Sequence, residues 1–139
     1  IVGEGLLGDS LENEAKELNV NVEFVGRKNG IDLTAWYCCA DVFVLPSTME
    51  SFGAVTNEAL LGGCNCVISK LAGSACLIKE GVNGFLADPH SVDAIARQID
   101  KACQLPIDSA RSSKMFITFA DAMKSMAEEI NRKVLRVFI

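Results

Sequence analysis

The sequence has a single histidine, His90, and no C-x-x-C pair among its six cysteines. Zinc sites combine cysteine and histidine ligands at short, regular spacings, so this composition disfavours one. Cys64 and Cys66 remain open as a reactive pair, but reduced cysteines in the core of a cytosolic protein are the simpler expectation. His90 is the one general-base candidate by residue type, and its place between Pro89 and a predicted helix cap at Ser91 favours a surface role.

Long apolar runs and an excess of basic charge are also lacking. No run approaches the roughly 20 residues that span a bilayer, and no signal peptide is visible. The 13 Lys and Arg residues against 18 Asp and Glu residues give a net charge of −5, which disfavours nucleic acid or an anionic membrane as a partner. Half of the 139 residues are hydrophobic and 22% are charged, which predicts one globular domain, residues 1–139, with a substantial core.

One central stretch organises the chain. Residues 41–45 (D-V-F-V-L) are an apolar, β-branched run that predicts a buried strand. A polar loop follows, and then a proline-free segment over residues 53–61 in which Val55, Ala59 and Gly62 share one helical face. A strand, a loop and the start of a helix form the place where open α/β sheets bind ligands.

Two glutamates frame this predicted helix start. A helix that begins near Gly53 leaves its free backbone N–H groups around residues 52–55, where an anion is favoured. Glu50 then lies in the loop just ahead of them, and Glu58 lies about 7 Å further along the axis at roughly 1.5 Å per residue. Gly53 lets a ligand approach the backbone closely. A diphosphate with hydroxyls on both sides, such as a nucleotide sugar, suits this layout.

The string D-V-F-V-L-P-S-x-x-E-S-F-G-x-V-x-x-E-A-L, with its Glu-x7-Glu spacing, resembles the signature of the group 1 (family 4) retaining glycosyltransferases of the GT-B fold. The resemblance continues through G-G-C-N-C-V-I-S at residues 62–69, G-V-N-G-F-L at residues 81–86 and D-P at residues 88–89. Gly3-Glu4-Gly5 matches upstream. The resemblance covers roughly residues 1–100 and points to the C-terminal, donor-binding domain of that fold.

The resemblance implies a role for each matched position. Glu58 is expected to hold the ribose hydroxyls, and Glu50 to contact the donor sugar as the catalytic glutamate. The residues expected to cradle the sugar and the diphosphate, stabilising charge on the leaving phosphate, are Glu50, Ser51, Phe52, Gly53, Ala54 and Val55. Two simpler roles stay open: Glu50 as a carboxylate that favours a helix N-terminus, and Glu58 as an exposed helix residue.

A second glycine motif lies at the start of the chain. Gly3-x-Gly5-x-x-Gly8 formally matches the dinucleotide-binding fingerprint, between a strand-like opening and a predicted helix. The next predicted strand, residues 20–25, does not end in the acidic residue that would hold a ribose 2′-hydroxyl. Within the resemblance, Gly3 and Gly5 instead form a turn beside the donor nucleotide. A plain strand-to-helix turn remains an alternative.

Two further loops bear on the nucleotide. The resemblance places Arg27 and Lys28 near the base or the diphosphate, although basic loop residues are often merely solvated. The loop after the strand at residues 65–69 departs from the pattern G-G-x-P-E of the family. Here Ala75 stands where proline is common and Cys76 where glutamate is common, so the role of residues 72–76, from Ala72 to Cys76, is open.

The order of elements predicts an α/β fold with a doubly wound, parallel, Rossmann-like sheet, the C-terminal half of a GT-B fold. Residues 1–3 and 20–25 are further predicted strands. Helices are predicted, in chain order, over residues 9–18, 31–40, 53–61, part of 71–78, 91–103, 109–119 and 121–135. The remaining predicted strands are residues 41–45, 65–69 and 85–87.

The chain opens as if a strand were already under way, so we expect a fragment. Against the family it lacks the acceptor-binding N-terminal domain and the first strand of the present domain, so the isolated chain is expected not to turn over. The implied activity is retaining transfer of a sugar from a nucleotide sugar, such as a UDP- or GDP-sugar, without a metal or other cofactor. The acceptor, a sugar, lipid or polysaccharide, is expected to bind the missing domain.

Three other functions stay open. One is a non-catalytic or degenerate nucleotide-sugar-binding module. Another is a different GT-B enzyme, such as a phosphorylase or an epimerase, although no cofactor-lysine motif is found. The third is a fragment of a nicotinamide-dependent dehydrogenase. For the full-length protein we expect a cytoplasmic location, or a peripheral one at a membrane, with no transmembrane segment.

Overall fold

A computed structural model describes residues 1–107 of the chain. The chain contains two compact units: the first is Ile1–Trp36, and the second begins at Tyr37. The helix α2 (Gly30–Cys39) begins in the first unit and ends in the second. The two predicted helices over residues 109–119 and 121–135 lie outside the described residues, and the single-domain expectation stays a prediction.

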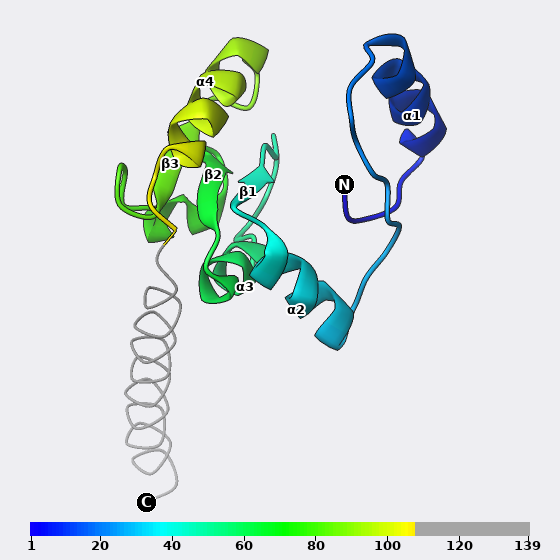
Figure 1. Ribbon diagram of the computed structural model, residues 1–139. Helices are drawn as coiled ribbons and strands as arrows, with labels where there is room; N and C mark the ends of the chain where they lie inside the picture. The colour runs from blue at the N-terminus through cyan, green and yellow to red at the C-terminus, as the bar shows by residue number, and fades with distance from the viewer. Residues whose placement is uncertain (108–139) are drawn as a thin grey trace, which may run out of the picture. The chain divides into compact units, whose positions relative to one another are not determined.

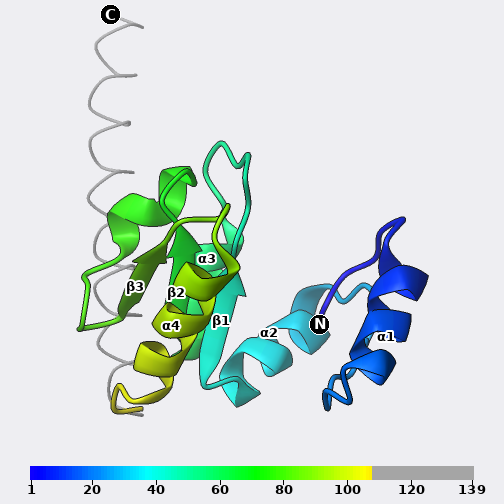
Figure 2. The same ribbon diagram turned by 90° about the horizontal axis from the view of Figure 1, so that it is seen from above.

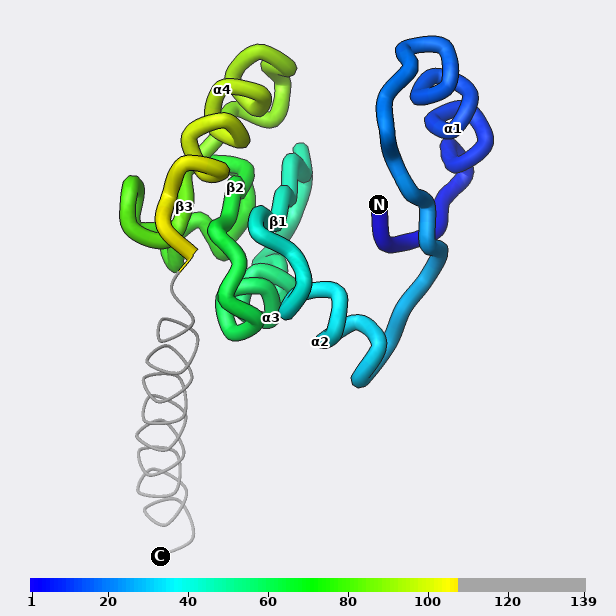
Figure 3. The backbone as a smooth tube through the Cα atoms, viewed as in Figure 1, coloured from blue at the N-terminus to red at the C-terminus, as the bar shows by residue number. Residues whose placement is uncertain are grey.

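The first unit contains α1 (Gly8–Glu17) and two extended segments that run side by side. The chain leaves α1 and returns past its own beginning (Figure 3). Three backbone hydrogen bonds join the segments, from Ile1 to Glu23 at 2.6 Å, from Val25 to Ile1 at 3.1 Å and from Gly3 to Gly26 at 2.9 Å. Neither segment forms a regular strand, so the strands predicted at residues 1–3 and 20–25 were wrong. An isolated pair of strands is only marginally stable.

The second unit contains a three-stranded parallel sheet in the order β1-β2-β3 (Figure 1). Its strands are β1 (Val42–Leu45), β2 (Asn65–Ser69) and β3 (Gly84–Ala87). The register pairs Val42 with Asn65 across β1 and β2, and Ser69 with Ala87 across β2 and β3. All five residues of the central strand are buried. The sequence predicted these three strands to within one residue, and the parallel α/β class is confirmed.

Helices cover both faces of this sheet, with α4 (Val92–Cys103) on one face and α3 (Val55–Gly62) on the other (Figures 1 and 2). The α4 face holds a core of the buried residues Val67, Ala87 and Ala102, against which pack the partly buried Val42, Val44, Phe85, Ile95 and Ile99. Ile95, Ile99 and Ala102 recur every three or four residues, the spacing of one helical face. Burial of this face fixes α4 on the sheet.

Two predicted features of α4 are confirmed. Ser91 caps its N-terminus, where the Ser91 hydroxyl accepts a hydrogen bond from the Ala94 N–H at 3.2 Å. His90 is exposed, in line with the surface role predicted for it. At the other end, the buried Asn65 side chain donates hydrogen bonds to the carbonyls of Ala102 at 3.2 Å and Leu105 at 3.3 Å. The first residue of β2 thereby holds the last turn of α4.

Candidate functional site

The candidate site lies where β1 ends and α3 begins, as the sequence predicted. The chain leaves β1 at Leu45 and enters α3 at Val55, two residues later than the predicted helix start at Gly53. Counted from Val55, Glu58 lies about 4.5 Å along the helix axis, at 1.5 Å per residue, instead of the predicted 7 Å. Glu58 is therefore in the first turn of α3, closer to the helix N-terminus than expected.

Glu50 lies in the loop ahead of α3, and its carboxylate turns back onto that loop. Its Oε1 accepts a hydrogen bond from the Phe52 N–H at 3.3 Å. The side chain is half-buried. One carboxylate oxygen is thus oriented by the backbone of the loop, which fixes the direction in which the carboxylate points.

The N-terminus of α3 has no side-chain cap. Ala54 is the N-cap residue, and it has no side-chain oxygen with which to accept a hydrogen bond. Among residues 1–107, no acceptor pairs with the N–H groups of Gly53, Ala54 or Val55. Free N–H groups and the positive end of a helix dipole favour an anion at this place. The structure thus brings Glu50 and the backbone of residues 52–55 together around one uncapped helix start.

A 3-10 helix, η1 (Gly73–Leu77), packs against this loop and is hydrogen-bonded to it. The Ser74 N–H donates to the Phe52 carbonyl at 2.6 Å, and the Gly73 N–H donates to the Glu50 carbonyl at 3.3 Å. A side chain at Gly73 would overlap the Ser51 carbonyl, so this approach requires glycine. The loop at residues 72–76, whose sequence departs from the family pattern, therefore contacts the predicted donor-binding loop.

Gly53 occupies a closely packed position in the loop. It is buried and has a φ angle of +83°, a conformation that side-chain-bearing residues rarely adopt. A Cβ at this position would lie 2.9 Å from Ser74 Oγ and 3.1 Å from Leu45 Cδ2. Glycine is therefore required here for the backbone conformation of the loop and for the packing of the loop on η1. The close approach of a ligand, which the sequence predicted, is a separate reason for glycine.

Glu58 is exposed and lies beside the phenol of Tyr37, which comes from α2. Burial and the neighbouring Glu58 carboxylate raise the pKa of Tyr37 to about 12. The Tyr37 ring also meets Phe43 edge-on, with ring centroids 5.7 Å apart. The sequence reasoning missed Tyr37, and the only signal for it was a lone tyrosine in an apolar helix.

The other predicted nucleotide contacts gather in the first unit. The Gly3 N–H donates to the Gly26 carbonyl at 2.9 Å, and the Arg27 N–H donates to Glu4 Oε1 at 3.3 Å. The loops that carry Gly3, Gly5 and Arg27 therefore meet. Lys28 borders a separate hollow of about 590 Å³ together with Asp32 and Trp36.

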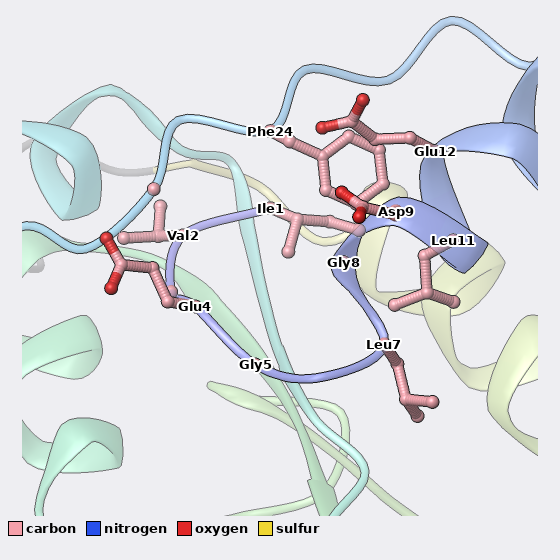
Figure 4. Close-up of a pocket in the computed structure, with 12 residues that line it drawn as sticks. Ile1, Val2, Glu4, Gly5, Leu7, Gly8, Asp9, Leu11, Glu12 and Phe24 are labelled. Atoms are coloured by element: carbon pink, nitrogen blue, oxygen red, sulfur yellow. The ribbon is translucent and has the colours of Figure 1, made fainter.

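A hollow of about 450 Å³ lies at the glycine-rich turn of the first unit (Figure 4). Its lining includes Gly3, Gly5 and Gly8 and three carboxylates, those of Glu4, Asp9 and Glu12. In Figure 4, Glu4 lies on one side of the turn, while Asp9 and Glu12 lie on the side of Phe24. Three negative charges oppose the pyrophosphate of a dinucleotide, so this lining disfavours the nicotinamide alternative.

The described part of the chain offers no metal centre and no membrane span. No group of three or more His, Cys, Asp or Glu side chains in it is arranged to hold a metal ion. None of its helices is long and apolar enough to cross a bilayer. Cys64 and Cys66 are buried, and burial, together with the neighbouring Cys38, raises the pKa of the Cys64 thiol to about 11. A buried thiol with a raised pKa is a poor nucleophile, which disfavours the reactive pair.

Comparison with known proteins identifies the family. The family model described as "Glycosyl transferases group 1" matches residues 1–121. The chain belongs to the group 1 glycosyltransferases. Both the first unit and the loop from β1 to α3 fall inside the matched segment of this group 1 domain.

Curated relatives agree with this assignment. An uncharacterized glycosyltransferase of Methanocaldococcus jannaschii is 40% identical over 103 residues, which are 73% of this chain and 26% of the relative. The D-inositol 3-phosphate glycosyltransferase of Corynebacterium glutamicum is 33% identical over 104 residues, 70% of this chain and 25% of the relative. The group 1 chain thus spans about a quarter of the length of these relatives.

Solved structures share the fold. The sucrose-phosphate synthase of Thermosynechococcus elongatus matches with a TM-score of 0.73 and 25% identity, over 93% of this chain and 34% of that one. HepE of Anabaena, solved in complex with UDP and glucose, matches with a TM-score of 0.61 and 25% identity, over 89% of this chain and 39% of that one. These neighbours confirm the Rossmann-like α/β class and, with the family match, the GT-B assignment.

Proposed function

We propose that this chain is the donor-binding part of a glycosyltransferase of the retaining, family 4 type, and that it binds a nucleotide-sugar diphosphate at the start of α3. One observation carries the proposal: the three N–H groups of residues 53–55, which have no acceptor in the described chain, lie between the loop that holds Glu50 and the helical turn that holds Glu58. An anionic diphosphate suits these donors.

Each residue has a role in this proposal. The N–H groups of Gly53, Ala54 and Val55 bind the diphosphate and stabilise the charge that develops on the leaving phosphate. Glu50, with one oxygen held by the Phe52 N–H, directs its other oxygen to the hydroxyls of the donor sugar. Glu58 accepts hydrogen bonds from the ribose. No step in this scheme uses a metal ion or another cofactor.

One solved neighbour supports uridine diphosphate as the first nucleotide to test: HepE of Anabaena, 27% identical to this chain, was solved in complex with UDP. In the first unit, the turn at Gly3 and Gly5 and the loop at Arg27 and Lys28 are proposed to contact the nucleotide. The acceptor is proposed to bind the rest of the protein, for which we propose a cytoplasmic or membrane-peripheral location.

Calorimetric titration of the 139-residue chain tests the proposal. UDP and GDP are titrated, with NADH as the comparison ligand, against the wild-type chain and the Glu58→Ala variant. We expect binding of a diphosphate that Glu58→Ala weakens at least about tenfold, because a hydrogen bond to a charged group contributes about 1.5–3 kcal/mol. Asp100→Asn, an exposed acid of α4, is the matched control for the change in net charge and is expected to bind as the wild type does.

Three results would contradict the proposal. NADH binding without diphosphate binding would indicate a dinucleotide site. Equal weakening by Glu58→Ala and Asp100→Asn would indicate a general effect of charge. Absence of diphosphate binding by the folded wild-type chain would remove the donor site as proposed. A further result would concern Glu50 alone: if Glu50→Gln binds a UDP-sugar as tightly as the wild-type chain does, Glu50 makes no contact with the donor sugar, as in a non-catalytic module.

A further inference from the structure

Two buried hydroxyls lie beneath the loop that carries Glu50. Thr56 Oγ1 and Ser74 Oγ are 2.9 Å apart and hydrogen-bonded, and both side chains are fully buried. Thr56 belongs to the first turn of α3, and Ser74 belongs to η1. The hydrogen bond therefore joins the helix whose N-terminus forms the candidate anion site to the 3-10 helix that supports the loop.

Ser74 also holds the loop through its main chain. Its N–H donates to the Phe52 carbonyl at 2.6 Å, and the neighbouring Gly73 N–H donates to the Glu50 carbonyl at 3.3 Å. A Cβ on Gly53 would approach Ser74 Oγ to 2.9 Å. Ser74 thus contacts the loop before α3 by its backbone and the first turn of α3 by its hydroxyl.

The chemistry of the pair sets the geometry of the site. A hydroxyl that is fully buried must find a partner, and loss of that partner costs about 1–3 kcal/mol. The Thr56 and Ser74 hydroxyls are hydrogen-bonded to each other, and this bond holds η1 and α3 at a fixed separation. Because residues 50–55 lie between these two attachments, their carbonyls and N–H groups are fixed as well. Neither hydroxyl is accessible to a ligand, so any effect of the pair on binding acts through the loop.

We propose that Thr56 and Ser74 are positioning residues for the donor diphosphate, and this inference rests on the function proposed above. The pair holds the N–H groups of Gly53, Ala54 and Val55 in the direction that the diphosphate needs. The departing loop at residues 72–76 thereby keeps a role at the donor site through Ser74, although the proline and glutamate that are common in the family are absent.

Thr56 offers an isosteric test. Thr56→Val keeps the shape of the side chain and removes the hydroxyl, and Thr56→Ser removes a methyl group and keeps the hydroxyl. Calorimetric titration with UDP is carried out well below the melting temperature of each variant. We expect Thr56→Val and Ser74→Ala each to weaken UDP binding at least about fivefold, and Thr56→Ser to bind within about twofold of the wild type. The double variant is expected to bind about as weakly as either single one, because the two hydroxyls act together.

The Ser91→Ala variant distinguishes a purely structural role of the Thr56 and Ser74 pair from a role in positioning the diphosphate. Ser91 caps α4 by a hydrogen bond to Ala94 and is no part of the loop, so its loss lowers the melting temperature without a change in the dissociation constant for UDP. If Thr56→Val and Ser74→Ala also lower only the melting temperature, the pair is a core contact and this inference is wrong while the donor site stands. Failure of the wild-type chain to bind a diphosphate would instead overturn the proposed function together with this inference.

Discussion

The phenol of Tyr37 lies beside the carboxylate of Glu58, the residue proposed to hold the ribose. Tyr37 is 8% exposed, and α3 packs so closely against it that a Cβ at Gly62 would lie 2.6 Å from Tyr37 Cβ. The C-terminal half of α2 therefore seats α3 through one aromatic residue. The position of Glu58 depends on this contact as well as on the length of the loop.

Charge removal at Glu58 is expected to lower the pKa of Tyr37. The chain has one tyrosine, so phenolate absorbance during an alkaline titration reports this residue alone. In the wild type the pKa is raised to about 12, by burial first and by Glu58 second. Glu58→Gln removes the second cause, so the pKa should fall while staying above the usual value near 10. The Asp100→Asn control should leave it unchanged, and an unchanged pKa in Glu58→Gln would place the carboxylate away from the phenol.

Stability at high pH should depend on the same phenol. The pKa of Tyr37 in the folded chain is higher than the ordinary tyrosine value of 10.0, so the protonated phenol stabilises the folded state below about pH 10. That contribution is lost as the pH rises from about 10 to about 12. The difference in free energy of unfolding between the wild type and Tyr37→Phe should therefore shift in favour of the variant across this range. Urea denaturation at several pH values measures it, and a difference independent of pH would contradict the prediction.

Gly53→Ala should destabilise the chain more than Gly81→Ala. Both glycines have positive φ angles, +83° and +72°, but a Cβ added at Gly81 would meet no atom within 4 Å, whereas one added at Gly53 would lie 2.9 Å from Ser74 Oγ. Backbone strain alone costs about 1–2 kcal/mol in each variant. Overpacking adds about 1–3 kcal/mol at Gly53. Thermal denaturation compares the two variants. Equal losses of stability would contradict the prediction, because they would show that the loop before α3 accommodates the added methyl group without a loss of free energy.

The sequence predicted those elements whose signals are local. A signal within a few residues was enough to predict the apolar strand β1, the buried strand β2 and the Ser91 cap of α4. All three are confirmed. The segments at residues 1–3 and 20–25 carry a similar apolar signal without becoming strands, because a regular strand needs neighbours that these residues alone do not provide. The resemblance to the group 1 family, now confirmed, rested on a motif that is itself local.

The contacts within the candidate site were harder to predict. The Glu50 and Glu58 spacing located the loop and α3, but their partners, Ser74 beside the loop and Tyr37 beside α3, are distant in sequence and were not singled out. Ser74 lies 18 residues from Thr56 in the chain, and no periodicity links the two. The sequence around Ser74 gives no indication that its hydroxyl is buried against another hydroxyl. Only the fold brings Ser74 and Thr56 together. The roles of the predicted site residues in binding a donor remain predictions.

The six cysteines should divide into two classes toward an alkylating reagent. Cys38, Cys39, Cys76 and Cys103 are exposed, whereas Cys64 and Cys66 are buried. The Cys64 thiol donates a hydrogen bond to the Tyr37 carbonyl at 3.1 Å. Because burial raises its pKa to about 11, little of it is thiolate near neutral pH. Iodoacetamide should therefore modify four cysteines in the folded chain and all six in denaturant, as counted by mass spectrometry.

Peptide mapping of the modified chain gives the sharper form of this test. Cys64 directly precedes the central strand β2, and Cys66 is the second residue of that strand, between β1 and β3. Both are buried, so they can react only when the sheet opens. Their rate of modification should follow the free energy of unfolding, and Ser91→Ala, which weakens the cap of α4, should increase it without changing the rate at Cys76. Modification of Cys64 in the folded wild type as fast as at Cys38 would restore the reactive pair that the sequence left open.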